Sequence, residues 1–402
     1  MKTIPILLIV SLLFGCTSSA NNEENNQEDP TTNDVPKGPV MGAEQMDVYL
    51  PLLEGKRVAM LVNHTTMLGE THLVDTLKSR GVNIVKVFAA EHGFRGDADA
   101  GQKIEDGVDS RTGIPIVSLY GKTRKPTAEM LADIDMIIYD IQDVGVRFYT
   151  FISTMHHTME AAAESGKQYM VLDRPNPNGM YVDGPIREDS LKSFVGINPV
   201  PVVHGLTVGE MAQMAVGEKW LGDGLDLDLN VIAMKNYTHN DEYSVPIKPS
   251  PNLPNDQAIK LYASTCLFEG TTLSEGRGTY EPFQKIGHPD LKGVYEFSFT
   301  PVGIKGMASK PKHKDVECFG IDLSGKEVKR EYTLSYLLDF YNKFPDKGSF
   351  WKKYINLLEG TGALRSQIEQ GMTEEEIRQT WEPGLSDFKK ARKKYLLYPD
   401  FN

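Results

Sequence analysis

Acidic side chains recur after short apolar segments and in glycine-rich loops of the 402-residue chain. They are Glu91, Asp140, Asp143, Asp173, Asp183, Glu269 and Glu275. Hydrolysis of a glycosidic bond needs one carboxylic acid that protonates the leaving oxygen. It also needs a second group that activates water, attacks the sugar or stabilises the cationic transition state. As a set these acids favour such chemistry, although any one of them could instead cap a helix or brace a loop.

Arginines and aromatic residues accompany these acids. The arginines are Arg95, Arg147, Arg174 and Arg277, and the aromatic residues are Phe94, Phe148, Tyr149 and Tyr280. A guanidinium group either pairs with a neighbouring carboxylate or binds an anionic ligand group with two hydrogen bonds. Aromatic rings offer flat surfaces against which a sugar ring can pack. The combination favours a carbohydrate ligand that carries a negative charge.

The elements that must position these residues alternate between strands and helices. Continuous apolar runs predict strands at 58–62, 84–90, 116–119, 136–140 and 169–173, and helices are predicted at 72–80, 127–131 and 153–165. Strands that are apolar throughout and alternate with helices are typical of a parallel sheet covered on both faces. We therefore expect an α/β fold with a Rossmann-like parallel sheet.

Polar clusters follow four of these predicted strands, at 63–66, 91–96, 142–149 and 173–177. In open α/β sheets, ligands bind outside the carboxyl ends of the strands. The same rule therefore predicts that these loops converge on one site.

The chain changes character near residue 246. Four prolines precede a glycine-rich loop at 268–279, and further strands are expected around 294–322, with helices around 333–343, 366–370 and 374–393. We expect a Rossmann-like domain at 43–245 and a smaller α+β domain at 246–402. The proline segment would form the hinge region between them.

The first residues of the chain predict localisation to the cell envelope. Lys2 precedes an apolar run at 4–14, and Gly15-Cys16 follows it, which resembles a lipoprotein signal (1–15) with Cys16 as the acylated residue. Residues 16–42 are mainly polar and predict a disordered tether. We expect a protein anchored to the membrane by lipid in the cell envelope of a Gram-negative-type bacterium, facing the periplasm or the outside. An ordinary cleaved signal peptide is the alternative.

Composition and missing motifs exclude several functions. A net charge of −12 argues against nucleic-acid binding. No G-x-G-x-x-G follows the first predicted strand, and P-loop, H-E-x-x-H and G-x-S-x-G motifs are absent from the sequence. We expect no cofactor and no metal, although Asp140, Asp143, Asp173 and His92 leave a metal-dependent enzyme open.

The ordered set of motifs resembles the NamZ family of exo-β-N-acetylmuramidases. The matching segments are 91–96, 140–150, 173–177, 182–185, 201–210, 249–252, 269–279 and 392–398. This resemblance covers roughly residues 45–398, and it implies a Rossmann-like domain beside a smaller domain, with the active site in the cleft between them. It also implies release of terminal β-1,4-linked N-acetylmuramic acid from the non-reducing ends of peptidoglycan fragments. The implied partner is thus a peptidoglycan-derived glycan or muropeptide.

Roles follow as hypotheses for this reaction. Glu91 is the expected general acid, kept protonated by desolvation beside Phe94, and Asp143 or Glu275 is the expected second carboxylate. Arg277 or Arg95 would bind the lactyl carboxylate of the sugar. The remaining residues expected to bind substrate are His92, Arg147, Tyr149, Asp173, Arg174, His204, Asn252 and Glu269.

Other classes of function stay open on the sequence alone. The main alternative is a non-catalytic envelope protein that binds a muropeptide or another anionic sugar in the same cleft. An ester or amide hydrolase that uses His204 and Ser274 is a further one, without the strand–turn–helix motif that such enzymes carry. Within the glycosidase hypothesis, the acetamido group of the substrate could itself attack the anomeric carbon.

Overall fold

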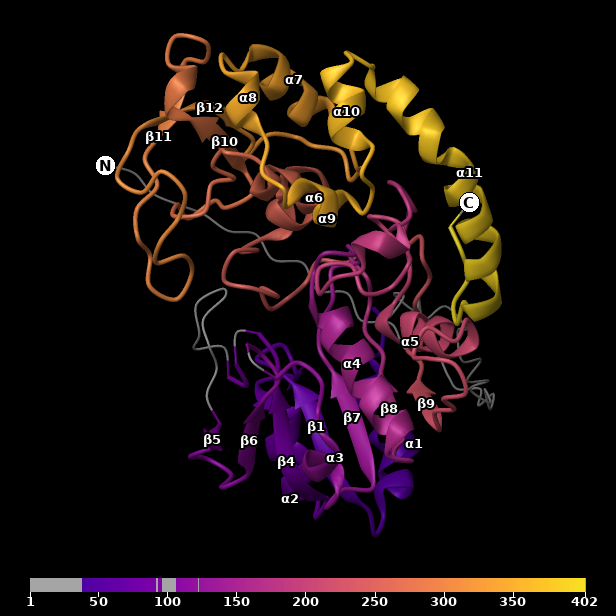
Figure 1. Cartoon of the computed structure of the whole chain (residues 1–402). Coiled ribbons are helices and arrows are strands. Elements are labelled where there is room, and N and C mark those ends of the chain that lie inside the picture. Colours follow the sequence, from indigo (N-terminus) through magenta and orange to yellow (C-terminus); the bar gives the residue numbers. More distant parts are fainter. Residues whose placement is uncertain (1–37, 92, 96–105, 122, 402) are drawn as a thin grey trace, which may run out of the picture. The chain divides into compact units, whose positions relative to one another are not determined.

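The computed structural model describes residues 38–91, 93–95, 106–121 and 123–401. The predicted leader with Cys16, and also His92, lie outside these ranges. In the described chain, β1 (Arg57–Val62) lies at the centre of a sheet with the order β5-β6-β4-β1-β7-β8-β9 (Figure 1). The other strands of this sheet are β4 (Asn83–Ala89), β5 (Gly107–Val108), β6 (Pro115–Ser118), β7 (Met136–Asp140), β8 (Gln168–Leu172) and β9 (Leu229–Ile232).

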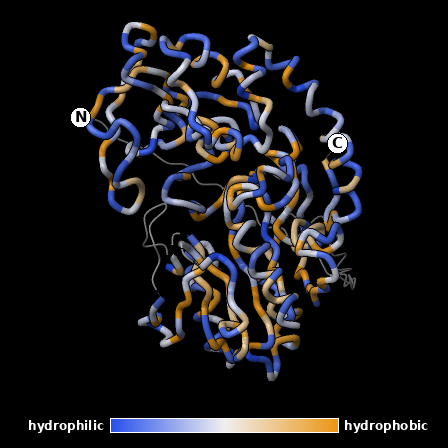
Figure 2. Tube along the Cα trace, in the orientation of Figure 1, coloured by the Kyte–Doolittle hydropathy of each residue, from blue (hydrophilic) through white to orange (hydrophobic). Residues whose placement is uncertain are grey.

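All neighbouring strands of this sheet run parallel except β5, which pairs antiparallel with β6. Alternate residues of β1 enter two different cores: Val58, Met60 and Val62 pack on one face, and Ala59 and Leu61 on the other. Both faces are therefore covered, which is why the strands are apolar throughout. Figure 2 shows these hydrophobic runs along the central strands. The predicted α/β fold with a Rossmann-like sheet is confirmed.

Helices cover the two faces of the sheet. On the face of Val58, the first core takes in residues of α1 (Met46–Tyr49) and α2 (Leu73–Ser79). On the face of Ala59, the second core takes in residues of α4 (Phe151–Glu164) and α5 (Val208–Gly217). The short elements of this half are α3 (Ala128–Leu131), β2 (Met67–Leu68), β3 (Thr71–His72), η1 (Gly42–Glu44), η2 (Leu50–Leu53) and η3 (Asp189–Leu191).

Several elements were not predicted from the sequence, among them β9, α5 and α6 (Asp256–Thr265). The edge strand β9 is half-buried over most of its length, so it lacks the apolar run that marks the inner strands. Helix α5 begins with a capping box, in which the Thr207 side chain accepts from the Glu210 backbone and the Glu210 side chain accepts from the Thr207 backbone. That spacing of Thr and Glu is a sequence signature of a helix start.

The second half of the chain forms a smaller α+β part. Its sheet is antiparallel, with the order β10-β12-β11. Its strands are β10 (Lys285–His288), β11 (Phe297–Phe299) and β12 (Cys318–Asp322). Its helices are α6, α7 (Ser335–Lys343), α8 (Lys347–Phe350), α9 (Ile355–Glu359), α10 (Leu364–Glu369) and α11 (Glu374–Arg392), with 3-10 turns η4 (Cys266–Gly270), η5 (Pro289–Leu291) and η6 (Lys393–Tyr395).

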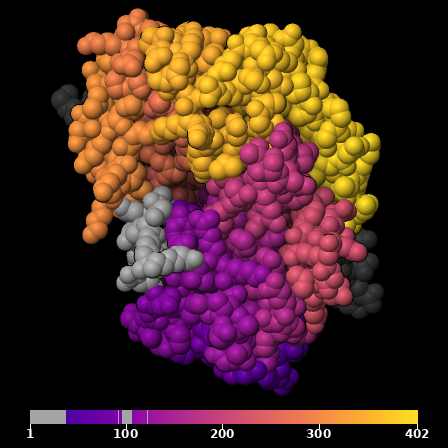
Figure 3. Space-filling model, in the orientation of Figure 1, coloured from indigo at the N-terminus to yellow at the C-terminus, as the bar shows by residue number. Residues whose placement is uncertain are grey.

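The two halves share one core. The core on the Ala59 face continues from the sheet into α6, α7 and α9, and Figure 3 shows the atoms of the second half packed directly against the first. The buried Arg147 ties the halves together: Nη1 donates to Pro185 O and Val200 O, and Nη2 donates to Leu358 O and Glu359 O at 2.9 and 2.5 Å. Four carbonyl partners explain why this charge is tolerated without exposure.

Cys266 and Cys318 are both buried and both free. Within the part of the chain that the structure describes, no helix is long and apolar enough to cross a bilayer.

Candidate active site

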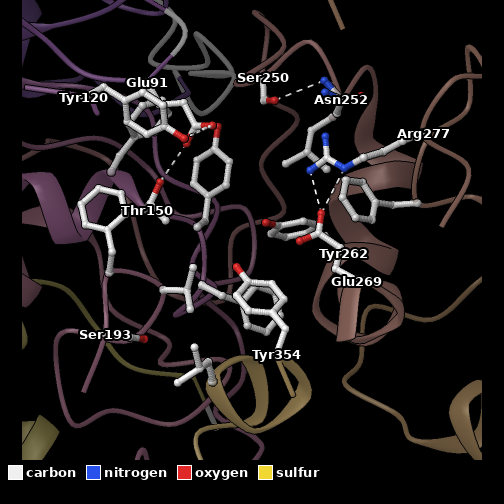
Figure 4. A pocket seen from close by; sticks show the side chains of 18 of the residues that line it. Glu91, Tyr120, Thr150, Ser193, Ser250, Asn252, Tyr262, Glu269, Arg277 and Tyr354 are labelled. Carbon is white, nitrogen blue, oxygen red and sulfur yellow. Dashed lines mark hydrogen bonds and ion pairs between the residues drawn. The ribbon is translucent and has the colours of Figure 1, made fainter. Parts of the chain in front are cut away.

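A cavity of about 370 Å³ lies between loops of the parallel sheet and the second half of the chain (Figure 4). Its volume is in the range of pockets that enclose a small polar ligand. The first half contributes Glu91, Tyr120, Arg124, Phe148, Tyr149, Thr150, Phe151, Ser193, Phe194 and Val195. The second half contributes Ser250, Asn252, Leu253, Tyr262, Glu269, Arg277, Phe283, Tyr354 and Leu357.

One wall of the cavity carries the carboxyl group of Glu91. Glu91 follows β4, and its Oε1 accepts a hydrogen bond from Tyr120, which follows the neighbouring strand β6, at 3.0 Å. Thr150, at the start of α4, donates to Oε2 at 3.1 Å. Burial and the nearby charge of Glu91 raise the pKa of Tyr120, so its hydroxyl stays a proton donor. Three loops at the carboxyl edge of the sheet thus fix one acid, Glu91.

The opposite wall carries an ion pair (Figure 4). Nε and Nη2 of Arg277 donate to Oε1 of Glu269 at 3.0 and 2.8 Å. The guanidinium also lies 5.0 Å from the ring centre of Phe283 and 3.5 Å from Oε1 of Glu275. Glu269 and Arg277, both expected to bind substrate, therefore line the cavity as partners of one another.

A loop of the second half holds this wall in place. The Lys312 ammonium donates to the carbonyl oxygens of Phe268, Thr271 and Leu273 and lies 3.0 Å from Oε2 of Glu275. Gly278 has a φ of +85°, and a Cβ there would meet Pro311 Cγ at 2.5 Å. Only glycine fits such a position without strain, because it tolerates positive φ and has no Cβ.

Asn252 and Tyr149, both expected to bind substrate, also line the cavity. Asn252 Nδ2 donates to Met307 O at 2.9 Å, while its buried Oδ1 has no hydrogen-bond partner among the described residues. Tyr149 donates to Pro249 O at 2.7 Å. An unpaired buried acceptor is costly, so Oδ1 of Asn252 is suited to accept a hydrogen bond from a ligand.

Asp143 and Glu275, the expected second carboxylates, lie behind the walls and do not line the cavity. Burial raises the pKa of Asp143 to about 7; its Oδ2 accepts from Gly145 N and lies 3.9 Å from His204 Nε2. Burial lowers the pKa of His204 to about 3, and this ring is likewise outside the cavity lining. Although burial alone would raise the pKa of Glu275, Lys312 and Arg277 hold it below its usual range.

The remaining sequence-predicted residues are not brought to the cavity. Arg95 pairs with Asp75 and Asp109, and Arg174 pairs with Asp140. Asp173 is fully buried and accepts from Thr207, Gly209 and Tyr398. Like the buried Arg147, these side chains already have hydrogen-bond or ion-pair partners within the protein, so they stabilise the fold at these positions. His92 lies outside the described residues.

Phe94 is placed differently from the expectation that it desolvates Glu91. Its ring packs in the core on the Val58 face, 4.9 Å from the ring of His72, and it does not line the cavity. Tyr120 and Thr150 surround the Glu91 carboxyl instead, because the neighbouring strand β6 and the start of α4 converge there.

Sequence reasoning missed Tyr120, Arg124, Thr150, Phe194 and Tyr354. A signal for two of them was present: Tyr120 and Arg124 follow the predicted strand at 116–119. The loop after this strand belongs to the same carboxyl edge of the sheet as the loops after the other predicted strands. Phe194 and Tyr354 come from loops with no such marker, and only the tertiary structure brings them in.

Among the described residues, no three His, Cys, Asp or Glu side chains come together as ligands for a metal ion. Asp140 and Asp173 bind Arg174 and Thr207, and Asp143 faces His204.

Fold and cavity define a Rossmann-like α/β protein with a cavity between an acid-bearing wall and an ion-paired wall. The chain belongs to the NamZ family: the models of exo-beta-N-acetylmuramidase NamZ match residues 58–257 for the N-terminal part and 260–398 for the C-terminal part. The predicted family membership is confirmed.

Named relatives agree with this assignment. The peptidoglycan beta-N-acetylmuramidase NamZ of Bacillus subtilis (strain 168) is 37% identical over 422 residues, which cover 99% of this chain and 100% of that protein. A crystal structure of a DUF1343 family protein from Bacteroides fragilis NCTC 9343 has a TM-score of 0.84 and 45% identity, and covers 90% of this chain and 100% of its own. A second such protein from the same organism has a TM-score of 0.77 and 32% identity, over 90% and 99% of the two chains.

Proposed function

We propose that this protein is an exo-acting glycoside hydrolase that releases terminal β-1,4-linked N-acetylmuramic acid from the non-reducing ends of peptidoglycan fragments. Membership of the NamZ family supports the reaction class. The observation that carries the assignment to a site is the Glu91 carboxyl group. It lines a cavity with several aromatic residues and is held by two hydroxyl donors.

Glu91 is the general acid of this proposal. In the protonated form of Glu91, the carboxyl proton passes to the glycosidic oxygen as the bond from that oxygen to the anomeric carbon breaks, and positive charge develops on the sugar ring. Tyr120 and Thr150 fix the direction of the carboxyl group. Orientation of this kind matters, because a proton donor must lie within hydrogen-bond reach of the leaving oxygen.

Glu269 is the second carboxylate that lines the cavity, and it is paired with Arg277. An ion-paired carboxylate is better suited to stabilise the developing positive charge than to donate a proton. The nucleophile is then water or the acetamido oxygen of the substrate. The anomer released first, followed by NMR, separates these routes: inversion indicates direct attack by water, and retention indicates the acetamido group or an enzyme nucleophile.

The test compares a chromogenic N-acetylmuramide with the matching N-acetylglucosaminide on purified protein. Wild-type protein should cleave the muramide. Glu91→Gln should lose about 100-fold or more of kcat, the usual contribution of a general acid, with a nearly unchanged Tm. Glu382→Gln, an exposed site on α11, is the matched control and should keep full activity.

Two outcomes would count against this proposal. A Glu91→Gln variant with near wild-type turnover would remove Glu91 from the reaction. A folded wild-type protein that binds muropeptide without cleaving it would instead support a non-catalytic binding protein.

We also propose that acylation of Cys16 anchors the protein in the cell envelope of a Gram-negative-type bacterium. Lys2, the apolar run at 4–14 and Gly15 before the cysteine support this proposal. Metabolic labelling of the full chain with a fatty-acid probe should label wild-type protein and Ser18→Ala, and not Cys16→Ser. Equal labelling of Cys16→Ser would contradict it.

A further inference from the structure

Among the described residues, two arginines line the cavity, Arg124 and Arg277, and they differ in whether a carboxylate is bound to them. Arg277 is already bound to Glu269 through two hydrogen bonds and lies 3.5 Å from Glu275. A substrate carboxylate placed there would be the third acid around one guanidinium group. Negative charges at such short distances repel one another, so Arg277 is poorly placed to bind a further anion.

Arg124 is free of such partners. It follows β6, lines the cavity, is exposed, and has no carboxylate partner among the described residues. The adjacent Lys125, by contrast, pairs with Glu160 and Glu164. Arg124 is thus the cavity arginine whose positive charge no carboxylate of the described residues neutralises.

An aromatic ring holds the Arg124 guanidinium group. Its central carbon lies 4.2 Å from the ring centre of Phe194, which also lines the cavity. Phe194 is itself stacked on the ring of His157, with 6.2 Å between centres and 8° between planes. A guanidinium group that rests on an aromatic face keeps the N–H groups at its edge available, and this edge matches the two oxygens of a carboxylate.

Arg124 lines the same cavity as Glu91, the proposed acid. Burial is the largest cause that raises the pKa of Tyr120, the charge of Glu91 raises it further, and the charges of Arg124 and Arg277 both oppose this shift. The segment after β6 carries both the hydroxyl that orients Glu91 and a cation that has no carboxylate partner among the described residues. In N-acetylmuramic acid the lactyl group is attached through O3 to ring carbon C3. Carbon C3 is two ring bonds away from the anomeric carbon C1. One wall can therefore contact both groups.

We propose that Arg124, supported by Phe194, binds the carboxylate of the anionic sugar and thereby selects N-acetylmuramic acid over the neutral N-acetylglucosamine. Arg277 then serves to hold Glu269 in the opposite wall. This inference rests on the proposed function, because it names the residue that recognises the charged group of that substrate.

Binding of the two free sugars tests the assignment directly. Calorimetry on wild-type protein, Arg124→Met and Lys125→Met would give Kd for N-acetylmuramic acid and for N-acetylglucosamine. Arg124→Met should weaken binding of N-acetylmuramic acid about 10- to 100-fold, the range for a lost charge-assisted hydrogen bond. Binding of N-acetylglucosamine should stay within about 2-fold, because this sugar lacks the carboxylate. Lys125→Met, which removes a neighbouring charge outside the cavity, should leave both values unchanged.

A second variant probes the aromatic support. Phe194→Leu keeps Arg124 and removes the ring beneath it, so it should weaken binding of N-acetylmuramic acid by a few-fold, the typical value of an exposed cation–π contact. The kcat/KM for the chromogenic muramide should fall in the same order: wild type, Phe194→Leu, Arg124→Met. Circular dichroism checks that each variant is folded, which exposure of Arg124 favours.

The failures of the two proposals are distinguishable. If wild-type protein cleaves the muramide and Arg124→Met binds N-acetylmuramic acid as tightly as wild type, the role of Arg124 is overturned and the function stands. If Arg277→Lys alone loses the preference for the charged sugar, the carboxylate belongs to Arg277. If folded wild-type protein neither cleaves the muramide nor binds N-acetylmuramic acid, both proposals fail.

Discussion

The hydroxyl of Tyr120 donates to Oε1 of Glu91 at 3.0 Å, and this bond joins the ends of two neighbouring parallel strands, β6 and β4. Strands that pair in a sheet place their carboxyl ends side by side, so loops that are distant in sequence meet at one edge. The pairing of the two strands therefore orients the carboxyl group of Glu91 in the cavity.

Loss of the Tyr120 hydroxyl should slow the reaction without unfolding the protein. Tyr120→Phe removes one of the two hydroxyl donors that we describe on Glu91, and a hydrogen bond of this kind contributes about 0.5–1.5 kcal/mol. We expect kcat on the chromogenic muramide to fall about 3- to 10-fold, with KM little changed. Tyr280→Phe is the control, because Tyr280 is 74% exposed. Equal kinetics of Tyr120→Phe and wild type would show that this bond does not orient the acid.

Lys312 should stabilise the ion-paired wall through Glu275. Lys312→Met leaves the buried Glu275 carboxylate without one of its two cations and three carbonyls without their donor. Breaking a buried ion pair in this way costs about 3 kcal/mol, measured as the free energy of unfolding in urea. Lys312→Met combined with Glu275→Gln should recover part of this loss, because no uncompensated charge remains. A double variant less stable than Lys312→Met would contradict this explanation.

Gly278 should be needed for its space as well as its backbone angle. Gly278→Ala would bring a Cβ to 2.5 Å from Pro311 Cγ, whereas Gly293, with a similar φ of +81°, has open space around the same position. Positive φ costs a non-glycine residue roughly 1 kcal/mol in both cases. We expect Gly278→Ala to lower Tm more than Gly293→Ala, and to lower activity as well, because Arg277 is the preceding residue. Equal effects of the two substitutions would leave the close contact without consequence.

Asp143 should make stability depend on pH. Burial raises the pKa of Asp143 to about 7, from an ordinary value of 3.8. The folded state therefore holds this proton where the unfolded state has lost it, so this contribution to stability is full below about pH 4 and is lost as pH rises through about 7.

Asp143→Asn removes this titration, and the asparagine Oδ1 can still accept from Gly145 N. The gain in Tm of Asp143→Asn over wild type should be larger at pH 8 than at pH 5. The comparison with wild type matters because His204, whose pKa is lowered to about 3, contributes a change of opposite sign between about pH 3 and 6.5. A difference in Tm that does not change with pH would show that Asp143 does not titrate in this range.

Much of the fold could be predicted from the sequence. The inner strands β1, β4, β7 and β8 are buried on both faces, so each is a largely continuous apolar run. Such a run can be identified from the local sequence without knowing which strands pair with it. Glu91 could be predicted for a related reason, because it follows such a strand and residues at that edge face a common site.

The tertiary structure alone decided the partners. Arg277 and Arg95 both follow glycines or aromatic residues in polar loops, so the sequence does not separate them. In the fold, Arg277 lines the cavity beside Glu269, whereas Arg95 pairs with Asp75 and Asp109 and does not line the cavity. The sequence shows which side chains are charged. Whether an arginine is neutralised depends on which acid the folded chain brings within about 3–4 Å of it. Beside Arg124 the fold places the aromatic ring of Phe194, and no acid of the described segments pairs with it.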